Sequence, residues 1–241
     1  MVTHNQVELH EGERIDDLLT ESQLKIIQSK EVFSFSLDAV LLARFARFPK
    51  NGRAADFCSG NGVIALLSTD KTEAHIDAIE IQPRLAEIAR RNVAMNGLEE
   101  RITIIEADLK EYALTAGNGI YDVITVNPPY MKSAAGDMNI NEHYAIARHE
   151  IHCNVEDIAK AACKLLRPGG KLFMVHRPSR LVDITEALRE WKIEPKVIQF
   201  VHSHINSEAN MVLIEATRDG KPDIRVLPPQ IVYNEAGEQV I

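Results

Sequence analysis

Two hydrophobic patterns alternate along most of the chain. Short runs of apolar, often β-branched residues indicate buried strands, and longer segments with apolar residues every three or four positions indicate helices. The clearest helix is expected over residues 83–95, where Pro83 marks the start and Asn96-Gly97 the end. Further helices are expected over about residues 39–48, 63–69, 155–166 and 180–191. Strands are expected over residues 54–57, 76–80, 102–105, 121–126, 171–175, 196–201 and 210–216.

The order of these elements predicts an α/β fold. Strands that alternate with helices form a doubly wound, mostly parallel sheet, because successive right-handed crossovers place helices on its faces. The pattern gives seven strands for this sheet. Because no helix is expected between the last two strands, we predict that they form an antiparallel pair at one edge.

Residues 1–50 precede the regular pattern and are expected to form a cap segment and a helix. Two short apolar stretches, at Leu18-Leu19 and from Leu24 to Ile27, predict a hairpin over one edge of the main domain. The helix after this hairpin has Asp38 or Ser36 as its candidate N-cap, since both side chains can accept a hydrogen bond from a free backbone N–H.

We predict a single domain over residues 1–241. Its core spans residues 51–218, and residues 219–241 form a C-terminal extension with a short edge strand over 230–233. The chain shows no internal repeats, low-complexity tracts or interdomain linkers, which would have argued for separate units.

The composition is that of a soluble globular protein, with 45% hydrophobic and 26% charged residues among 241. Residues 1–12 are polar and lack the apolar core of a signal peptide. The longest apolar runs, such as Val63 to Leu67, are too short to cross a bilayer. We therefore expect a cytoplasmic protein with no membrane partner, present as a monomer or weak homodimer.

The three cysteines argue against both a disulfide framework and a structural zinc site. Cys58, Cys153 and Cys163 are odd in number and have no paired spacing, so we expect them reduced and partly buried. Two histidines, His202 and His204, could share one side of an extended segment, but no third ligand lies nearby in sequence. No metal is expected.

The net charge of −8 means that the surface as a whole does not attract nucleic acid, so a polyanionic partner requires a local basic patch. Two candidate patches occur. One comprises Lys160, Lys164, Arg167, Lys171, Arg177 and Arg180, and the other comprises Arg44, Arg47, Lys50 and Arg53. Arg177 and Arg180 are the preferred phosphate contacts, because they follow a strand end; solvated helix faces are the alternative reading of both patches.

A candidate cofactor site follows the first strand of the core. Gly60-Asn61-Gly62 lies between a strand and a helix, where a tight turn and close approach of a ligand favour glycine. Asp56 lies four residues before Gly60, Glu80 ends the second strand, and Asp108 follows the third. Glu80 is placed to accept hydrogen bonds from ribose hydroxyls, and Asp108 from the exocyclic amine of an adenine.

Two cofactor classes fit the glycines. The pattern Gly60-x-Gly62-x-x-Ala65 also matches the dinucleotide fingerprint. An Asp-x-x-x-Gly-x-Gly arrangement is typical of S-adenosylmethionine (SAM) sites, however, and acids at three strand ends suit a positive sulfonium and amino group better than a pyrophosphate. We therefore predict SAM as the cofactor.

The fourth strand ends in Asn127-Pro128-Pro129-Tyr130. Consecutive prolines cannot continue a central strand, so the chain leaves the sheet in a rigid turn. The Asn127 side-chain oxygen and the Pro128 carbonyl could accept the two hydrogens of a planar amine, and Tyr130 could stack on its ring. Such a site acts mainly by orientation, turning the nitrogen lone pair toward the methyl donor.

Together these residues resemble the class I SAM-dependent methyltransferases that modify planar amino nitrogens. Four further segments resemble bacterial tRNA1(Val) adenosine-37 N6-methyltransferases. They are Phe33 to Ala43, Ala147 to Glu150, His176 to Leu181 and Leu227 to Tyr233. The resemblance covers about residues 15–236 and implies the Rossmann-like fold of that class. It also implies cofactor contacts from Asp38, Cys58 and Asn127, and methylation of an adenosine N6 at anticodon-loop position 37 of a valine tRNA.

Other functions remain open on the sequence. Release-factor glutamine N5-methyltransferases also use Asn-Pro-Pro-Tyr, although they usually carry a larger N-terminal helical domain. Guanine N2 methylation of rRNA is a second alternative, and a SAM-fold scaffold without turnover is a third. The aperiodic segment 131–150 is expected to form a loop beside the site.

Overall fold

The computed structural model describes residues 7–18, 20–29, 36–129, 153–234 and 236–240. Its centre is a nine-stranded sheet in the order β10-β8-β9-β7-β6-β3-β4-β5, with β11 also paired to β8. The long strands are β3 (Arg53–Phe57), β4 (His75–Glu80), β5 (Ile102–Glu106), β6 (Tyr121–Val126), β7 (Leu166–His176), β8 (Ile193–His202) and β9 (Ala209–Arg218). Two short strands, β10 (Arg225–Val226) and β11 (Gln230–Ile231), run along the outer side of β8.

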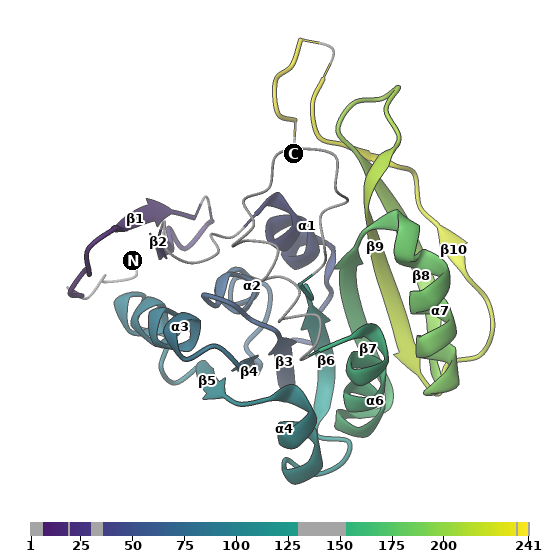
Figure 1. Cartoon of the computed structure of the whole chain (residues 1–241), viewed down its shortest axis with the longest axis horizontal. Helices are drawn as coiled ribbons and strands as arrows, with labels where there is room; N and C mark the ends of the chain where they lie inside the picture. The colour runs from purple at the N-terminus through teal and green to yellow at the C-terminus, as the bar shows by residue number, and fades with distance from the viewer. Residues whose placement is uncertain (1–6, 19, 30–35, 130–152, 235, 241) are drawn as a thin grey trace, which may run out of the picture.

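Helices cover both faces of this sheet (Figure 1). They are α1 (Leu37–Phe45), α2 (Val63–Ser68), α3 (Pro83–Met95), α4 (Leu109–Thr115), α6 (Val155–Leu165) and α7 (Leu181–Glu190), with a 3₁₀ turn, η1, at Pro178–Arg180. Buried residues of α1, α2 and α3 share one apolar cluster with the sheet, and those of α4, α6 and α7 share another. The result is a three-layer α/β architecture.

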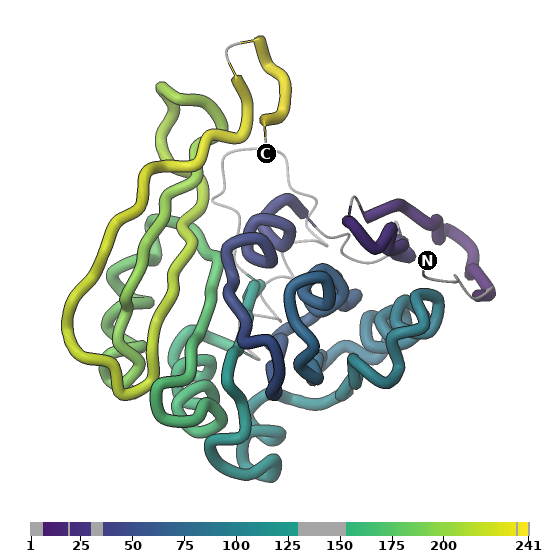
Figure 2. Tube along the Cα trace, turned by 180° about the vertical axis from the view of Figure 1, so that it is seen from behind, coloured from purple at the N-terminus to yellow at the C-terminus, as the bar shows by residue number. Residues whose placement is uncertain are grey.

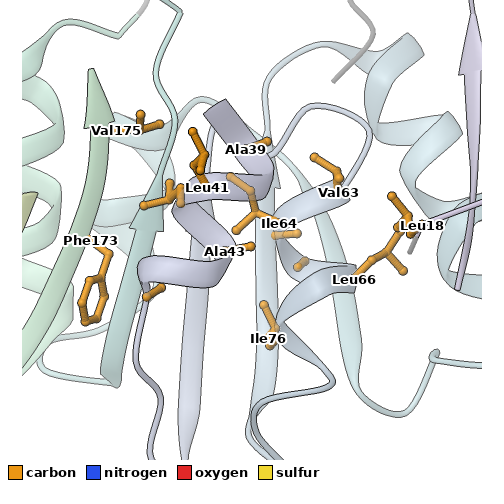
Figure 3. Close-up of a cluster of buried hydrophobic side chains, with 14 of the residues drawn as sticks. Leu18, Ala39, Leu41, Ala43, Val63, Ile64, Leu66, Ile76, Phe173 and Val175 are labelled. Carbon is orange, nitrogen blue, oxygen red and sulfur yellow. The ribbon is translucent and has the colours of Figure 1, made fainter. Parts of the chain in front are cut away.

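Alternation along each strand explains why two cores form. In β3, Ala54 belongs to the first cluster, whereas Ala55 and Phe57, which alternate with it along the strand, belong to the second. Figure 3 shows the first cluster, where Leu41 of α1 and Ile64 of α2 lie over the sheet. Strands buried on both faces read as continuous apolar runs, which is why they were visible in the sequence.

The predicted doubly wound sheet of seven strands is confirmed, and the two short strands enlarge it to nine. The antiparallel pairing of the last two long strands is also confirmed. β9 lies between β7 and β8 and is antiparallel to both, so β8 is the outer of the pair. Helix α4 and strand β10 were not predicted, because their seven and two residues show little periodicity and, unlike the six-residue α2, follow no glycine turn.

A hairpin before α1 lies beside α3, apart from the main sheet (Figures 1 and 2). It consists of β1 (Glu13–Asp17) and β2 (Lys25–Ser29) in antiparallel pairing. The hairpin was predicted, but its first strand ends before the expected Leu18-Leu19. Leu18 instead buries its side chain in the first apolar cluster.

Two asparagines, Asn92 of α3 and Asn96 at the C-cap of that helix, attach this hairpin. Asn92 accepts a hydrogen bond from the N–H of Ile27 at 2.6 Å, and Asn96 both accepts from and donates to the backbone of Lys25. Both asparagines are buried. They supply the partners that an edge strand would otherwise take from a neighbouring strand.

Of the two candidate N-caps of α1, Ser36 is confirmed in position and Asp38 is wrong. Ser36 occupies the N-cap position, but its side chain makes no capping hydrogen bond. Asp38 lies inside the first turn, where its charge favours the helix N-terminus without capping it. No helix in the described ranges is both long and apolar enough to span a membrane.

Candidate active site

The carboxyl ends of three adjacent strands lie level with one another. Val126 of β6 is paired with Phe57 of β3, which is paired with Ile79 of β4. The next residue of each strand or turn is therefore Asn127, Cys58 or Glu80, all at the same edge of the sheet. Open α/β sheets bind their ligands at this edge. The edge therefore brings together site residues that were predicted separately at the ends of three strands.

The turn after β3 requires glycine for its backbone conformation. Gly60 and Gly62 have φ of 57° and 84°, a region that costs residues with a Cβ. Among the described residues, an added Cβ would meet no atom within 4 Å at Gly60 and would meet Ala89 at ordinary contact distance at Gly62. The protein itself thus leaves room at this turn, and backbone geometry selects the glycines.

Glu80 fastens this turn from the neighbouring strand. Its Oε2 accepts a hydrogen bond from the N–H of Gly60 at 2.8 Å, and its Oε1 accepts one from the N–H of Gln82 at 2.9 Å. The side chain is buried, and burial raises the pKa of its carboxyl, an effect that the two N–H groups oppose. A carboxylate can accept further hydrogen bonds, so this contact leaves capacity for a ribose hydroxyl.

Asp56 lies beneath the turn with no exposed surface. Its Oδ1 accepts a hydrogen bond from the hydroxyl of Thr125 at 2.7 Å, while Oδ2 has no partner in the described part of the chain. Burial raises the pKa of this carboxyl to about 7; the Thr125 hydroxyl opposes the shift, and the charge of Glu80 adds to it. An added positive charge nearby would relieve this destabilised anion. Asp56 therefore fits a cationic cofactor through its charge.

Asp108 has a structural task that the sequence did not reveal. It is the N-cap of α4, where its Oδ1 accepts a hydrogen bond from the N–H of Lys110 at 2.8 Å. Its side chain remains partly exposed at the end of β5, next to the strand that carries Glu80. The cap holds the carboxylate in place at the expected end of the cofactor site.

Two residues that the resemblance assigns to the cofactor are placed on different elements. Cys58 directly follows β3 and begins the glycine turn, with φ of 55°. Asp38 is half-buried in the first turn of α1, which packs against α2, the helix that follows the turn. The segment 30–35 that joins α1 to the hairpin lies outside the described residues.

Beyond β6 the chain borders a small cavity. Its volume is about 110 Å³, and its lining includes Pro128, Pro129, His176 and Arg180. Pockets for drug-sized ligands are roughly 300–1,000 Å³, so this space suits one ring-sized group. Tyr130, the segment 131–150 and the motif Ala147 to Glu150 fall outside the described residues.

His176 is a cavity residue that sequence reasoning missed as a site residue. It ends β7, its side chain is buried, and its Nδ1 accepts a hydrogen bond from the N–H of Arg177 at 2.8 Å. Burial lowers the pKa of the imidazole to about 4, and the charge of Arg180 contributes. The ring is therefore neutral near pH 7, with its proton on Nε2. The sequence does contain a signal for this residue, because a histidine directly follows the apolar run of a predicted buried strand.

The two basic patches prove to be largely occupied by structural contacts. Arg47 and Lys171 both pair with the buried Glu215 of β9, which links the segment after α1 to the sheet. Arg53 pairs with Asp77 and Arg167 with Asp122. These ion pairs explain much of the clustering in sequence without invoking RNA.

Other basic residues remain at solvent-facing positions. Arg44 is exposed and lines a groove between α1 and the C-terminal extension, whose volume is about 490 Å³. Arg177 donates a hydrogen bond to the carbonyl of Asn210, and Arg180 pairs with Asp183 while lining the cavity beside Pro128. Among the predicted phosphate contacts, Arg180 is thus nearest to the candidate site.

One cluster within the described ranges has the spacing of a metal site, namely His10, Glu13 and Glu87. Arg91 forms ion pairs with both glutamates, and Arg84 pairs with Glu13. The hydrogen bond from Arg91 lowers the pKa of Glu13 to about 2. The cluster is accounted for as an ion-pair network that holds the N-terminal segment to α3.

The chain is similar to two curated proteins called tRNA1(Val) (adenine(37)-N6)-methyltransferase. It is 29% identical to the one from Aeromonas hydrophila over 201 residues, covering 83% of each chain. It is 31% identical to the one from Porphyromonas gingivalis strain W83 over 175 residues, covering 70% of this chain and 68% of the relative.

The fold is similar to the crystal structure of a predicted O-methyltransferase from Agrobacterium tumefaciens. The TM-score is 0.69 at 21% identity, with 84% of this chain and 91% of that chain covered. A family model described as the methyltransferase small domain matches residues 23–192, which is most of the chain. The chain therefore belongs to the methyltransferase small domain family.

Proposed function

We propose that this protein transfers a methyl group from SAM to the exocyclic N6 of an adenosine in tRNA. By its relatives' names, the target is position 37 in the anticodon loop of a valine tRNA. The observation that carries the proposal is the level register of β6, β3 and β4. It puts Asn127-Pro128-Pro129 at the sheet edge that also holds the glycine turn and Glu80.

The acids of this edge support SAM as the cofactor. SAM supplies an electrophilic methyl group on a positive sulfonium. Asp56 provides a buried carboxyl group with one oxygen that has no partner in the described part of the chain, and Glu80 provides acceptors beside the turn. No described residue comes within 4 Å of a Cβ built at Gly60, which lets a ligand approach the backbone there. Asp108, Asp38 and Cys58 complete the proposed cofactor set.

Asn127 and Pro128 position the acceptor amine. The lone pair of the adenine amine is delocalised into the ring, so the nitrogen is a weak nucleophile. If the Asn127 side-chain oxygen and the Pro128 carbonyl accept its two N–H groups, the lone pair turns toward the methyl group in line with the bond to sulfur. The proton leaves after transfer, when the nitrogen carries the positive charge. Stacking by Tyr130 remains part of the proposal.

The small cavity supports a base that has left its stack. A stacked adenine cannot bring its amine to a strand end, so the base must be flipped out or already lie in a loop. The lining by Pro128, Pro129 and His176 offers apolar surface with a polar edge. An anticodon loop presents unstacked bases at low cost. With tRNA as substrate, we extend the proposal to a cytoplasmic enzyme.

One assay tests the proposal against its rivals. The purified protein and tritiated SAM are incubated in three separate reactions, with unmodified total tRNA, with ribosomal subunits or with release factor. The labelled products are then hydrolysed. Label in N6-methyladenosine from tRNA is expected. Label only in N2-methylguanosine or in methylglutamine would replace the proposal, and SAM binding without label anywhere would favour a scaffold.

A further inference from the structure

Two cysteines that are far apart in sequence meet beside the active site. The Sγ atoms of Cys58 and Cys153 lie 3.8 Å apart, within range of a thiol–thiol hydrogen bond. Both residues are partly exposed. Cys58 begins the glycine turn, and Cys153 directly precedes Asn154, the N-cap of α6. The sequence showed no paired spacing, so only the fold brings these thiols together.

The backbone at Cys58 adds a second observation. Its φ of 55° lies in the left-handed region, which glycine adopts freely and other residues adopt at a cost. A cysteine held there by its surroundings points its thiol at a second thiol. The proposed methyl transfer uses neither sulfur as a nucleophile.

We propose that Cys58 and Cys153 form a reversible disulfide that turns the active site off under oxidising conditions. The structural half of this proposal stands by itself, whereas the loss of methyl transfer rests on the proposed function. In reducing compartments disulfides of this kind are transient and regulatory rather than structural.

Closing the bond requires a small displacement. A disulfide has a sulfur–sulfur length of about 2.05 Å, so the two atoms must approach by about 1.8 Å from their separation of 3.8 Å. Cys58 lies between Asp56 and Gly60, and Cys153 lines the cavity beside Pro128. The approach must therefore shift either the cofactor turn or the cavity wall.

Thiol–disulfide exchange with a low-molecular-weight disulfide supplies the oxidant. The Cys153 thiolate attacks one sulfur of the small disulfide, forming a mixed disulfide and releasing one small thiolate, which takes up a proton. Cys58 then loses its proton and attacks the Cys153 sulfur, releasing the second small thiol. Two protein thiols give two electrons and two protons to the small disulfide, which becomes two thiols.

The order of these steps follows from the surroundings of Cys58. The neighbouring Cys153 thiol and burial raise the pKa of the Cys58 thiol, so Cys58 is a poor attacker of an external disulfide. Once Cys153 carries the mixed disulfide, the reaction at Cys58 is intramolecular and the sulfur is already close. Resolution of the mixed disulfide is then favoured over release from Cys153.

The test uses the full-length protein and glutathione disulfide as the oxidant. Reduced protein is incubated over a series of glutathione ratios, free thiols are blocked with N-ethylmaleimide, and peptides are mapped without reduction. Methyl transfer to tRNA and SAM binding are measured on the same samples, before and after dithiothreitol. For each variant, the activity of the oxidised sample is divided by the activity of the reduced sample, so that differences in basal activity between variants cancel.

A peptide linking Cys58 to Cys153 is expected, together with a loss of activity on the order of tenfold to hundredfold, since displacements near 1 Å at a reacting centre can cost that much. Dithiothreitol should restore activity. Cys163→Ser, which keeps the pair, should behave like wild type. Cys153→Ser should form no linked peptide and keep an activity ratio near one.

Two outcomes would overturn the proposal. One is the absence of the linked peptide at every glutathione ratio, and the other is a linked protein whose methyl transfer and SAM binding equal those of the reduced form. If reduced protein methylates nothing, the proposed function fails, while the linked peptide and the change in SAM binding still decide the fate of the disulfide.

Discussion

The carboxylate of Glu80 accepts a hydrogen bond of 2.8 Å from the backbone N–H of Gly60. The acid predicted to bind ribose therefore also fixes the turn predicted to cradle the cofactor. If the turn approaches the ligand through its backbone, as we propose, loss of this contact should disturb the site even before a ribose contact is lost. We therefore expect cofactor binding and turn geometry to depend on the same buried side chain.

Replacing Glu80 tests this double role. Glu80→Gln keeps the shape but loses the charge, and hydrogen bonds to charged groups contribute about 1.5–3 kcal/mol, so SAM affinity should fall roughly tenfold to a hundredfold. Isothermal titration calorimetry measures the change. Glu106→Gln is the matched control, since Glu106 is the sheet partner of Glu80 on β5 and pairs with the exposed Arg90. Equal losses in both variants would contradict the assignment.

Removal of the Asn127 amide should separate chemistry from binding. We expect Asn127→Ala to lower kcat by roughly 10²–10³-fold, the cost of losing one preorganised polar group at a reacting centre, with SAM affinity unchanged. Single-turnover transfer from tritiated SAM and calorimetry give the two quantities. Asn118→Ala, an exposed change before the opposite end of β6, should leave both unchanged. A variant at Asn127 that no longer binds SAM would show that the cofactor contact implied by the resemblance is its main role, and that positioning the amine is not.

Asp56 should make the protein less stable as pH rises. The pKa of its carboxyl is about 7 when folded, against 3.8 as the ordinary value. Between these values the folded state binds more protons than the unfolded state, so the free energy of unfolding falls as pH increases. Asp56→Asn keeps an acceptor for Thr125 and should remove this pH dependence. The free energy of unfolding of the variant, minus that of wild type, should therefore be a few kcal/mol larger at pH 8 than at pH 4. Urea unfolding of both proteins at the two pH values checks it; parallel pH profiles would exclude Asp56 as the titrating group.

The two asparagines of α3 should differ in their effect on the cofactor. Asn92 joins Ile27 of the hairpin to the carbonyl of Asn61 in the glycine turn, through hydrogen bonds of 2.6 and 3.0 Å, whereas Asn96 bonds to the backbone of Lys25 in the hairpin and to the carbonyl of Asn92. Alanine at either position leaves buried backbone groups without their hydrogen-bond partners, which should lower the free energy of unfolding by about 1–3 kcal/mol for each group. Only Asn92→Ala should also weaken SAM binding. Urea unfolding and calorimetry distinguish the two effects, and equal SAM affinities would show that the turn is held without Asn92.

Charge reversal at the cavity rim should weaken RNA binding. Arg180 lines the cavity, so Arg180→Glu should reduce tRNA affinity. The plot of log affinity against log salt concentration should become less steep by about one, as expected for the loss of one phosphate contact. Arg189→Glu is the matched control, because Arg189 lies at the far end of the helix that follows Arg180 and pairs with Glu194. Filter binding over a range of salt gives both slopes. Indistinguishable slopes for the two variants would remove Arg180 from the RNA interface.

Local patterns were sufficient for most of the architecture. Residues 83–95 were predicted as a helix and form α3 with those bounds, because amphipathic spacing and the terminal Pro and Gly act within the segment. The buried parallel strands were equally visible as apolar runs. Helix α4 was missed, and with it the capping role of Asp108, since its seven residues show little periodicity and, unlike the shorter α2, follow no glycine turn.

The sequence by itself determined the α/β order of elements, the glycine turn, the acids that follow its strands and the Asn-Pro-Pro turn, because each depends on neighbours along the chain. Only the tertiary structure decided that Asn127, Cys58 and Glu80 share one edge, since strand register is set between strands. It also decided that Asp56 is wholly buried and that Cys58 meets Cys153. Burial and long-range contact arise from packing of segments distant in sequence, and no local pattern encodes them.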